Sequence, residues 1–160
     1  SLSTLLNEWA GGPLENRSIQ AVTMAGLSGG FIAGNDLNVT LDDPALKMLG
    51  SFLGAGGIMV FDDRRNMVEI AKLAMEFFAD ESCGKCFPCR IGTQRISERL
   101  GRKNISIDPM SWLEELNDLG AVMKSTSACG LGTAAPNVSD SLLKYFPDQV
   151  KRHLQALKID

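Results

Sequence analysis

Cysteines are the residues of this sequence whose spacing could do chemistry. Cys83, Cys86 and Cys89 follow one another at a strict three-residue interval, and the fourth cysteine, Cys129, lies much farther along the chain. Thiolates are strong ligands for soft metal ions and the usual ligands of iron–sulfur clusters. Three thiolates on one tight loop with a remote fourth are typical of a cubane cluster. We therefore predict that Cys83, Cys86, Cys89 and Cys129 together hold one 4Fe–4S cluster.

A structural zinc ion is the main alternative occupant of the four cysteines. Structural zinc commonly uses two separated pairs of ligands, whereas this run would crowd three thiolates onto one ion. Disulfides or free thiols are less favoured, because no export signal accompanies the cysteines. With zinc, the chain would be a non-enzymatic interaction module stapled by the metal. Metal analysis of protein purified without oxygen distinguishes the two.

The residues that adjoin the cysteines are expected to surround the cluster. Although the net charge of the chain is −3, the segment from Cys83 to Lys103 is basic, with Glu98 as its single acid. Positive charge near a cluster favours its reduced state, and glycines let backbone N–H groups approach sulfur. Arg95, Arg99 and Arg102 are expected on the solvated face of a helix. The residues predicted to surround the cluster are Gly84, Lys85, Arg90, Gly130, Leu131 and Gly132.

Helices are predicted to position these cysteines. Apolar stripes at helical spacing begin at Met67, Trp112, Val138 and Val150, and the last of them extends to Leu157. One helix is capped by Asp63 or Asn66 and ends near residue 80, a second spans about 89–100, and a third runs from 109 to about 125. Asp108-Pro109 starts the third helix with a capping carboxylate followed by proline. The connection between the second and third helices is expected at 101–107.

The second and third helices are predicted to form an antiparallel hairpin. At 1.5 Å per residue, the second helix runs away from the cysteine loop for about 18 Å, and the third returns over about 25 Å. This return path brings Cys129 beside Cys83, Cys86 and Cys89, although it is distant from them in sequence.

The first part of the chain has a different pattern. Residues 1–13 indicate a short helical start with Leu5, Leu6 and Trp9 on one side, and Asp43 caps a short helix that ends at Leu49. Strands are predicted at 18–24, 31–33, 37–41 and 57–61, the last buried on both faces. The predicted organisation is a lead-in at 1–14, a small sheet carrying one helix at 15–61, and a helical region at 62–160.

Composition excludes several classes of function. A chain of 160 residues with 44% hydrophobic residues and no long apolar run is expected to be soluble and globular, without a membrane span. The net charge gives no indication of nucleic-acid binding. His153 is the only histidine, and no catalytic triad or Cys–His pair can be assembled, so we predict no catalytic residue. The chain is therefore expected to relay electrons rather than to catalyse a reaction by itself.

Two motifs give the chain a family resemblance. It resembles the flavin- and NADH-binding subunit of respiratory complex I and the diaphorase subunits of NAD-reducing hydrogenases and NAD-dependent formate dehydrogenases. Ile91 and Gly130 stand where the complex I form has Glu and Ala, which favours the diaphorases. The matching residues are Glu81-Ser82-Cys83-Gly84-Lys85-Cys86-x-Pro88-Cys89-Arg90-x-Gly92 and Cys129-x-Leu131-Gly132, supported by the glycine-rich segment from Leu53 to Val60.

The resemblance implies an α+β fold, in which a small ubiquitin-like β-grasp domain precedes an all-α helical bundle with a 4Fe–4S cluster. In that family a Rossmann-like domain for NADH and FMN comes first, and this chain matches only the later parts. FMN and NAD(H) are therefore expected only in the full-length parent, and the chain alone is expected to be inactive with NADH. Because it begins with Ser1, it is expected to be a processed product or a piece of a longer protein.

The implied partners are the missing N-terminal flavin domain and other iron–sulfur subunits of a multisubunit oxidoreductase, with no nucleic acid and no direct membrane span. The implied location is the cytoplasm or the cytoplasmic face of a membrane complex.

Overall fold

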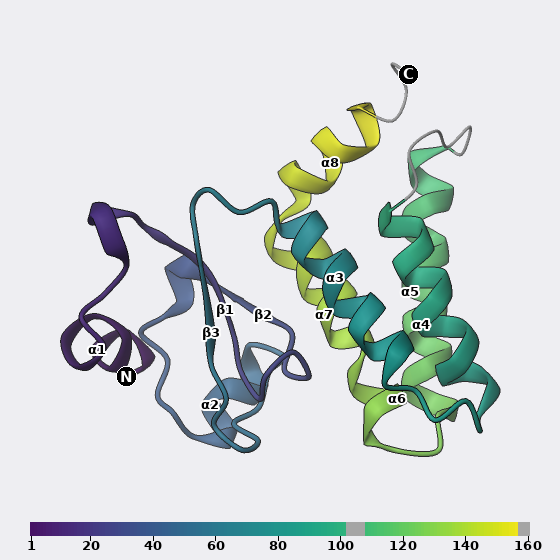
Figure 1. Cartoon of the computed structure of the whole chain (residues 1–160), viewed down its shortest axis with the longest axis horizontal. Helices are drawn as coiled ribbons and strands as arrows, with labels where there is room; N and C mark the ends of the chain where they lie inside the picture. Colours follow the sequence, from purple (N-terminus) through teal and green to yellow (C-terminus); the bar gives the residue numbers. More distant parts are fainter. Residues whose placement is uncertain (102–107, 157–160) are drawn as a thin grey trace. The chain divides into compact units, whose positions relative to one another are not determined.

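The computed structural model describes residues 1–101 and 108–156, which belong to two compact units, Ser1–Arg65 and Asn66–Asp160 (Figure 1). Together they make a mixed α/β protein with a small sheet in the first unit and helices in the second. Of the predicted elements, the 101–107 connection (apart from Gly101) and the helix end at Leu157 lie outside the described residues, as do Arg102 and Lys103.

A three-stranded antiparallel sheet organises the first unit. Its strand order is β2-β1-β3, and Val22 in the central strand stands opposite Ile32 on one side and Val60 on the other. The strands are β1 Ile19–Thr23, β2 Phe31–Ala33 and β3 Met59–Asp62; the helical segments are α1 Leu2–Thr4, α2 Asp43–Met48, the π-helical turn η1 Leu5–Trp9, and the 3₁₀ turns η2 Leu14–Asn16 and η3 Gly34–Asp36.

Residues 37–41 of the first unit were predicted to form a strand, and this prediction is wrong. The predicted strand at 37–41 is not a strand, because the carbonyls of Leu37 and Val39 accept hydrogen bonds from the backbone N–H groups of Ser3 and Leu2 instead. Leu37 belongs to a buried cluster that the N-terminal residues share with the sheet and α2, and Val39 and Leu41 pack against this cluster. The buried members of this cluster are Leu2, Leu6, Val22, Met24, Ile32, Leu37 and Leu46.

Three smaller predictions in the first unit also need correction. β3 is an edge strand with Val60 45% exposed, so it is not buried on both faces. Trp9 is 78% exposed and does not share a buried side with Leu6. The N-cap of α2 is Asp42, whose carboxylate accepts from Ala45 N–H, rather than Asp43. The pKa of Asp42 is lowered by its side-chain hydrogen bond with Thr40 and by this capping bond.

The second unit contains only helices among its described residues. The helices are α3 Met67–Asp80, α4 Phe87–Gly101, α5 Pro109–Thr126, α6 Gly130–Ala134, α7 Pro136–Tyr145 and α8 Pro147–Ala156. Asn66 caps α3 by accepting from Val68 and Glu69 N–H, and Asp108 caps α5 in the same way through Met110 and Ser111. α3 and α5 therefore begin where the capping residues in the sequence predicted.

α4 and α5 form the predicted antiparallel hairpin. A methyl group on Gly92, near the start of α4, would overlap the side chain of Met123, near the end of α5. At the other end of the pair, the indole Nε1 of Trp112 donates to the backbone carbonyl of Arg99. Early residues of one helix thus meet late residues of the other, so the end of α5 lies beside the start of α4.

None of the described helices has both the length and the apolar character needed to cross a membrane.

Candidate metal centre

The four cysteines gather where the α4–α5 hairpin is open. Cys83 and Cys86 lie in the loop after α3, Cys89 is in the first turn of α4, and Cys129 is the N-cap residue of α6 (Figure 1). The short helix α6 packs against both α4 and α5, which holds Cys129 at this end of the hairpin. All four cysteines are free thiols, and only Cys89 is buried, with 4% of its surface exposed.

Charge and hydrogen bonding couple the four sulfur atoms. Burial raises the pKa of the Cys89 thiol, a hydrogen bond with Ser82 opposes this shift, and negative charge on Cys86, Cys129 and Cys83 raises that pKa further. The pKa of Cys86 is lowered because the backbone N–H groups of Ala128 and Cys89 donate to its sulfur. The Ala128 amide immediately precedes Cys129, so the remote segment already contacts the first cysteine loop.

Gly132 fits the site because it lacks a side chain. A Cβ atom at this position would lie 2.5 Å from Ser127 Oγ and 2.9 Å from Cys89 Cβ, both far inside normal contact distance. Gly130, two residues earlier in the same short helix, has no atom within 4 Å of its ideal Cβ position. The structure therefore explains the glycine at 132 by close packing between α6 and Cys89.

Four other residues were predicted to surround the cluster, and the structure places each of them in a different environment. Gly84 has a left-handed backbone with φ of +73°, which lets the loop turn between the first two cysteines. Arg90 is exposed and its guanidinium lies 5.7 Å from the centre of the Phe87 ring, as in a cation–π contact. Lys85 is exposed, whereas Leu131 is partly buried in α6.

The prediction that Arg99 lies on a solvated face is wrong. Arg99 is only 9% exposed, and its Nε lies 2.6 Å from Glu115 Oε2 on α5. Arg95, in contrast, lies at the surface and pairs with Glu98 within α4. The sequence pattern could not separate them, because the burial of Arg99 depends on the packing of α5 against α4.

Two serines near the cysteines were not singled out from the sequence. Ser82 Oγ lies 3.3 Å from Cys89 Sγ, and Ser127 Oγ is buried with no hydrogen-bond partner among the described residues. Their positions in the sequence could have identified them, since Ser82 directly precedes Cys83 and Ser127 lies two residues before Cys129. Hydroxyl groups so close to ligand positions are candidates for hydrogen bonds to sulfur.

The chemistry of the donor set fits an iron–sulfur cluster. Buried Cys89 interacts electrostatically with the other three cysteines, the Ala128 amide donates to Cys86 Sγ, and Ser82 Oγ lies 3.3 Å from Cys89 Sγ. Within the described ranges, no three His, Cys, Asp or Glu side chains are arranged to hold a single metal ion. A cubane distributes its four thiolates over four iron atoms, so its ligands stand farther apart than those around one ion.

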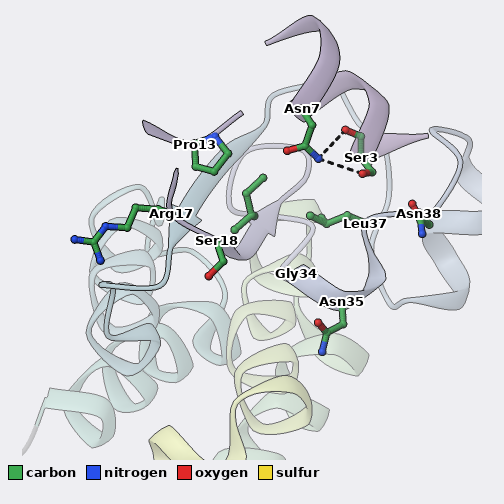
Figure 2. Close-up of a pocket in the computed structure, with 10 residues that line it drawn as sticks. Ser3, Asn7, Pro13, Arg17, Ser18, Gly34, Asn35, Leu37 and Asn38 are labelled. Atoms are coloured by element: carbon green, nitrogen blue, oxygen red, sulfur yellow. Dashed lines mark hydrogen bonds between the residues drawn. The ribbon is translucent and has the colours of Figure 1, made fainter. Parts of the chain in front are cut away.

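A polar cavity of about 390 Å³ lies elsewhere, within the first unit (Figure 2). Asn7 Nδ2 donates to the carbonyl and to the hydroxyl oxygen of Ser3, while Ser18 donates to Asp63. The Arg17 side chain extends away from the other labelled residues and lies 3.7 Å from Asp63. Asn7, Ser18 and Arg17, which line this cavity, already interact with other residues of the unit. The cysteine region is therefore the stronger candidate for a functional site.

Comparisons with known proteins agree with a metal centre of this kind. Residues 69–153 match the family model described as the NADH-ubiquinone oxidoreductase-F iron-sulfur binding region. The chain is 36% identical, over 99% of its own length, to the NADP-reducing hydrogenase subunit HndC of Solidesulfovibrio fructosivorans. It is 37% identical, over 97% of its length, to the F 2 subunit of the NADH-quinone oxidoreductase of Rhizobium meliloti (strain 1021). It spans 32% of the first relative and 37% of the second.

A solved structure of a hydrogenase is also similar to this chain. The chain is similar to an NAD⁺-reducing [NiFe]-hydrogenase in its H2-reduced state, with a TM-score of 0.74 and 32% sequence identity, over 90% of this chain and 24% of the other. The matching family model is that of a 4Fe–4S region, so the prediction of this cofactor from the cysteine spacing is confirmed. Because that model covers more than half of the residues, the chain belongs to the family of the NADH-ubiquinone oxidoreductase-F iron–sulfur binding region.

Proposed function

We propose that this chain is the electron-transfer part of an NAD(H)-linked flavin and iron–sulfur oxidoreductase subunit. Cys83, Cys86, Cys89 and Cys129 hold its 4Fe–4S cluster, and the chain has no catalytic residue of its own. The observation that supports the proposal most is the electrostatic interaction of Cys89 with the other three cysteines, at the open end of the α4–α5 hairpin where α6 packs. When bound, a 4Fe–4S cluster accepts and returns single electrons.

The residues of the chain prepare this site in distinct ways. Three cysteines on one loop and the first turn of α4 supply one side, and α6 supplies Cys129 from the other. The Ala128 amide stabilises the negative charge of Cys86, which favours the thiolate needed for ligation. Lys85 and Arg90, both exposed, add positive charge that favours the reduced state. Gly84, Gly130, Leu131 and Gly132 complete the proposed surroundings.

We also propose the role of each segment. Residues 1–14 form a lead-in or the end of an upstream domain, 15–61 a β-grasp domain of the soluble-ligand-binding type, and 62–160 a helical bundle. The small antiparallel sheet with one helix and the division between Arg65 and Asn66 support this organisation. In the parent protein, FMN and NAD(H) would bind to an N-terminal domain, and electrons would pass between FMN and a partner's iron–sulfur centre.

The names of the relatives support the proposed partners. The two relatives are named as a subunit of an NADP-reducing hydrogenase and as a subunit of an NADH-quinone oxidoreductase. We therefore propose that this chain works with other iron–sulfur subunits, in the cytoplasm or on the cytoplasmic face of a membrane complex.

Anaerobic reconstitution with iron and sulfide tests the proposal. We expect about four iron atoms and four sulfides per chain and, after reduction, the EPR signal of a 4Fe–4S cluster. The reconstituted chain alone should not oxidise NADH with ferricyanide as acceptor. Stoichiometric zinc without iron or acid-labile sulfide, in protein purified without oxygen, would instead support the zinc-stapled interaction module.

Gly132→Ala is expected to disturb the site, whereas Gly130→Ala should not. The new methyl group at 132 would overlap Ser127 and Cys89, and such overpacking commonly costs about 1–3 kcal/mol. Because Cys89 and α6 would have to separate, we expect a lower iron content after reconstitution. Gly130→Ala adds the same methyl group to the same helix in open space, and it serves as the matched control. Equal iron content in the two variants would contradict the packing role of Gly132.

A further inference from the structure

We propose that the hydroxyl groups of Ser82 and Ser127 donate hydrogen bonds to sulfur at the Cys89 corner of the cluster and thereby raise its reduction potential. This inference rests on the proposed ligation by the four cysteines. It concerns two residues that bind no iron and would set how easily the bound cluster is reduced.

The direction of the Ser82 hydrogen bond follows from its two partners. The backbone N–H of Gly84 lies 3.3 Å from Ser82 Oγ and donates to it, so this oxygen already accepts one bond. Cys89 Sγ lies 3.3 Å from the same oxygen. A thiolate that binds iron carries no proton and can only accept. The hydrogen of the Ser82 hydroxyl is therefore directed to Cys89 Sγ, in a chain that runs from amide to hydroxyl to sulfur.

Cys89 is the sulfur at which such a donor has the largest effect. It is the only buried thiol of the four, since Cys83 and Cys129 are exposed and Cys86 is intermediate. Negative charge away from water must be stabilised by protein groups. Ser82 Oγ, which lies 3.3 Å from Cys89 Sγ, is such a group. The buried sulfur of Cys89 thus has one hydroxyl donor, that of Ser82, within reach.

Ser127 approaches the same corner from the remote segment. Its Oγ is fully buried and has no hydrogen-bond partner in the described part of the chain. The point where Gly132 would carry a Cβ lies 2.5 Å from Ser127 Oγ and 2.9 Å from Cys89 Cβ, so the two side chains flank one small space. A buried hydroxyl without a partner is unfavourable and uncommon. Sulfur at this corner gives it an acceptor when the cluster is bound.

Hydrogen bonds to sulfur raise the potential because reduction adds negative charge to the cluster. Donors stabilise the more negative reduced state more than the oxidised state. Removal of either hydroxyl should therefore make reduction harder. We expect an about tenfold loss in the equilibrium constant for reduction in each alanine variant, which is about 59 mV for a one-electron couple.

Redox titration followed by EPR tests this in the reconstituted full chain. Ser82→Ala and Ser127→Ala should each lower the midpoint potential, and Ser82→Thr, which keeps the hydroxyl, should restore most of the wild-type value. Ser111→Ala is the matched control, because Ser111 is an exposed serine in the first turn of α5 and lies away from the cysteines. Pulsed EPR in D2O should also show an exchangeable proton near the reduced cluster that is lost in Ser82→Ala.

The outcomes separate this inference from the proposed function. If the wild-type chain holds no 4Fe–4S cluster, the proposed function itself fails. If the cluster is intact in both alanine variants and their potentials equal that of Ser111→Ala, the inference is overturned. Loss of the cluster from both alanine variants, but not from Ser82→Thr, would assign the hydroxyls to cluster retention and would equally overturn the tuning role.

Discussion

Cys129→Ala is expected to abolish the 4Fe–4S cluster, although Cys129 is far in sequence from the other three cysteines. The variant removes one thiolate and leaves no oxygen that could replace it. Cys129 is the N-cap of α6 but makes no side-chain capping bond, so the loss of its sulfur should leave the helix itself intact. The reduced variant should lack the 4Fe–4S EPR signal of the wild type and contain less iron.

The controls for Cys129→Ala separate ligation from folding. The far-UV circular dichroism of the apo variant should equal that of the apo wild type, because the thiol is exposed and contributes little packing. Cys89→Ala should also lose the cluster, and Gly130→Ala, which changes the residue next to Cys129 in open space, should keep it. A normal EPR signal and full iron content in Cys129→Ala would contradict the four-cysteine set.

The cluster chemistry could be predicted from sequence because it depends on residue type and local spacing. The three-residue interval of Cys83, Cys86 and Cys89 specifies a ligand loop, and Asp108-Pro109 specifies where the returning helix begins. Both signals are local. The family match confirms the 4Fe–4S cofactor that the cysteine spacing predicted. The resemblance to the complex I flavoprotein and diaphorase family is confirmed by the same match and by the similar hydrogenase structure.

The failures of prediction concern contacts between distant segments. The alternating residues at 37–41 resemble a strand, but their carbonyls bind the N-terminal segment, which no local pattern reveals. Ser127 Oγ and Cys89 Cβ come close to the same point beside Gly132 only because α6 packs onto α4. Arg99 likewise has the sequence surroundings of an exposed residue and becomes buried when Glu115 approaches from α5. The periodicity of a sequence describes a single helix or strand, whereas each of these features depends on a contact between two separate segments.

Glu115→Ala is expected to lower the free energy of unfolding of the helical unit by about 3 kcal/mol. The variant leaves the guanidinium of Arg99 buried between α4 and α5 without its partner, and a broken buried pair typically costs about 3–5 kcal/mol. We expect the lower end, because the side chain of Glu115 is 29% exposed and the pair is therefore only partly removed from water. Chemical denaturation of the apo chain, followed by circular dichroism, measures the change.

Glu98→Ala provides the matched control for Glu115→Ala. Glu98 also pairs with an arginine of α4, but the side chains of Arg95 and Glu98 are 45% and 49% exposed. Exposed pairs contribute only about 0–1 kcal/mol, so this variant should remain close to the wild type. Equal destabilisation by the two substitutions would show that burial of Arg99 has no energetic consequence.

The double variant Arg99→Met/Glu115→Leu distinguishes a stabilising ion pair from a buried charge that merely needs a partner. Replacement of a whole buried pair by apolar residues of similar size is often neutral or stabilising, because both desolvation penalties disappear. We therefore expect the double variant to regain most of the stability lost in Glu115→Ala. Because a stable α4–α5 hairpin keeps Cys129 beside Cys89, Glu115→Ala should also lower the iron content after reconstitution, and the double variant should regain it. Recovery of stability without recovery of iron content would mean that the ion pair, and not hairpin stability alone, is needed to position Cys129.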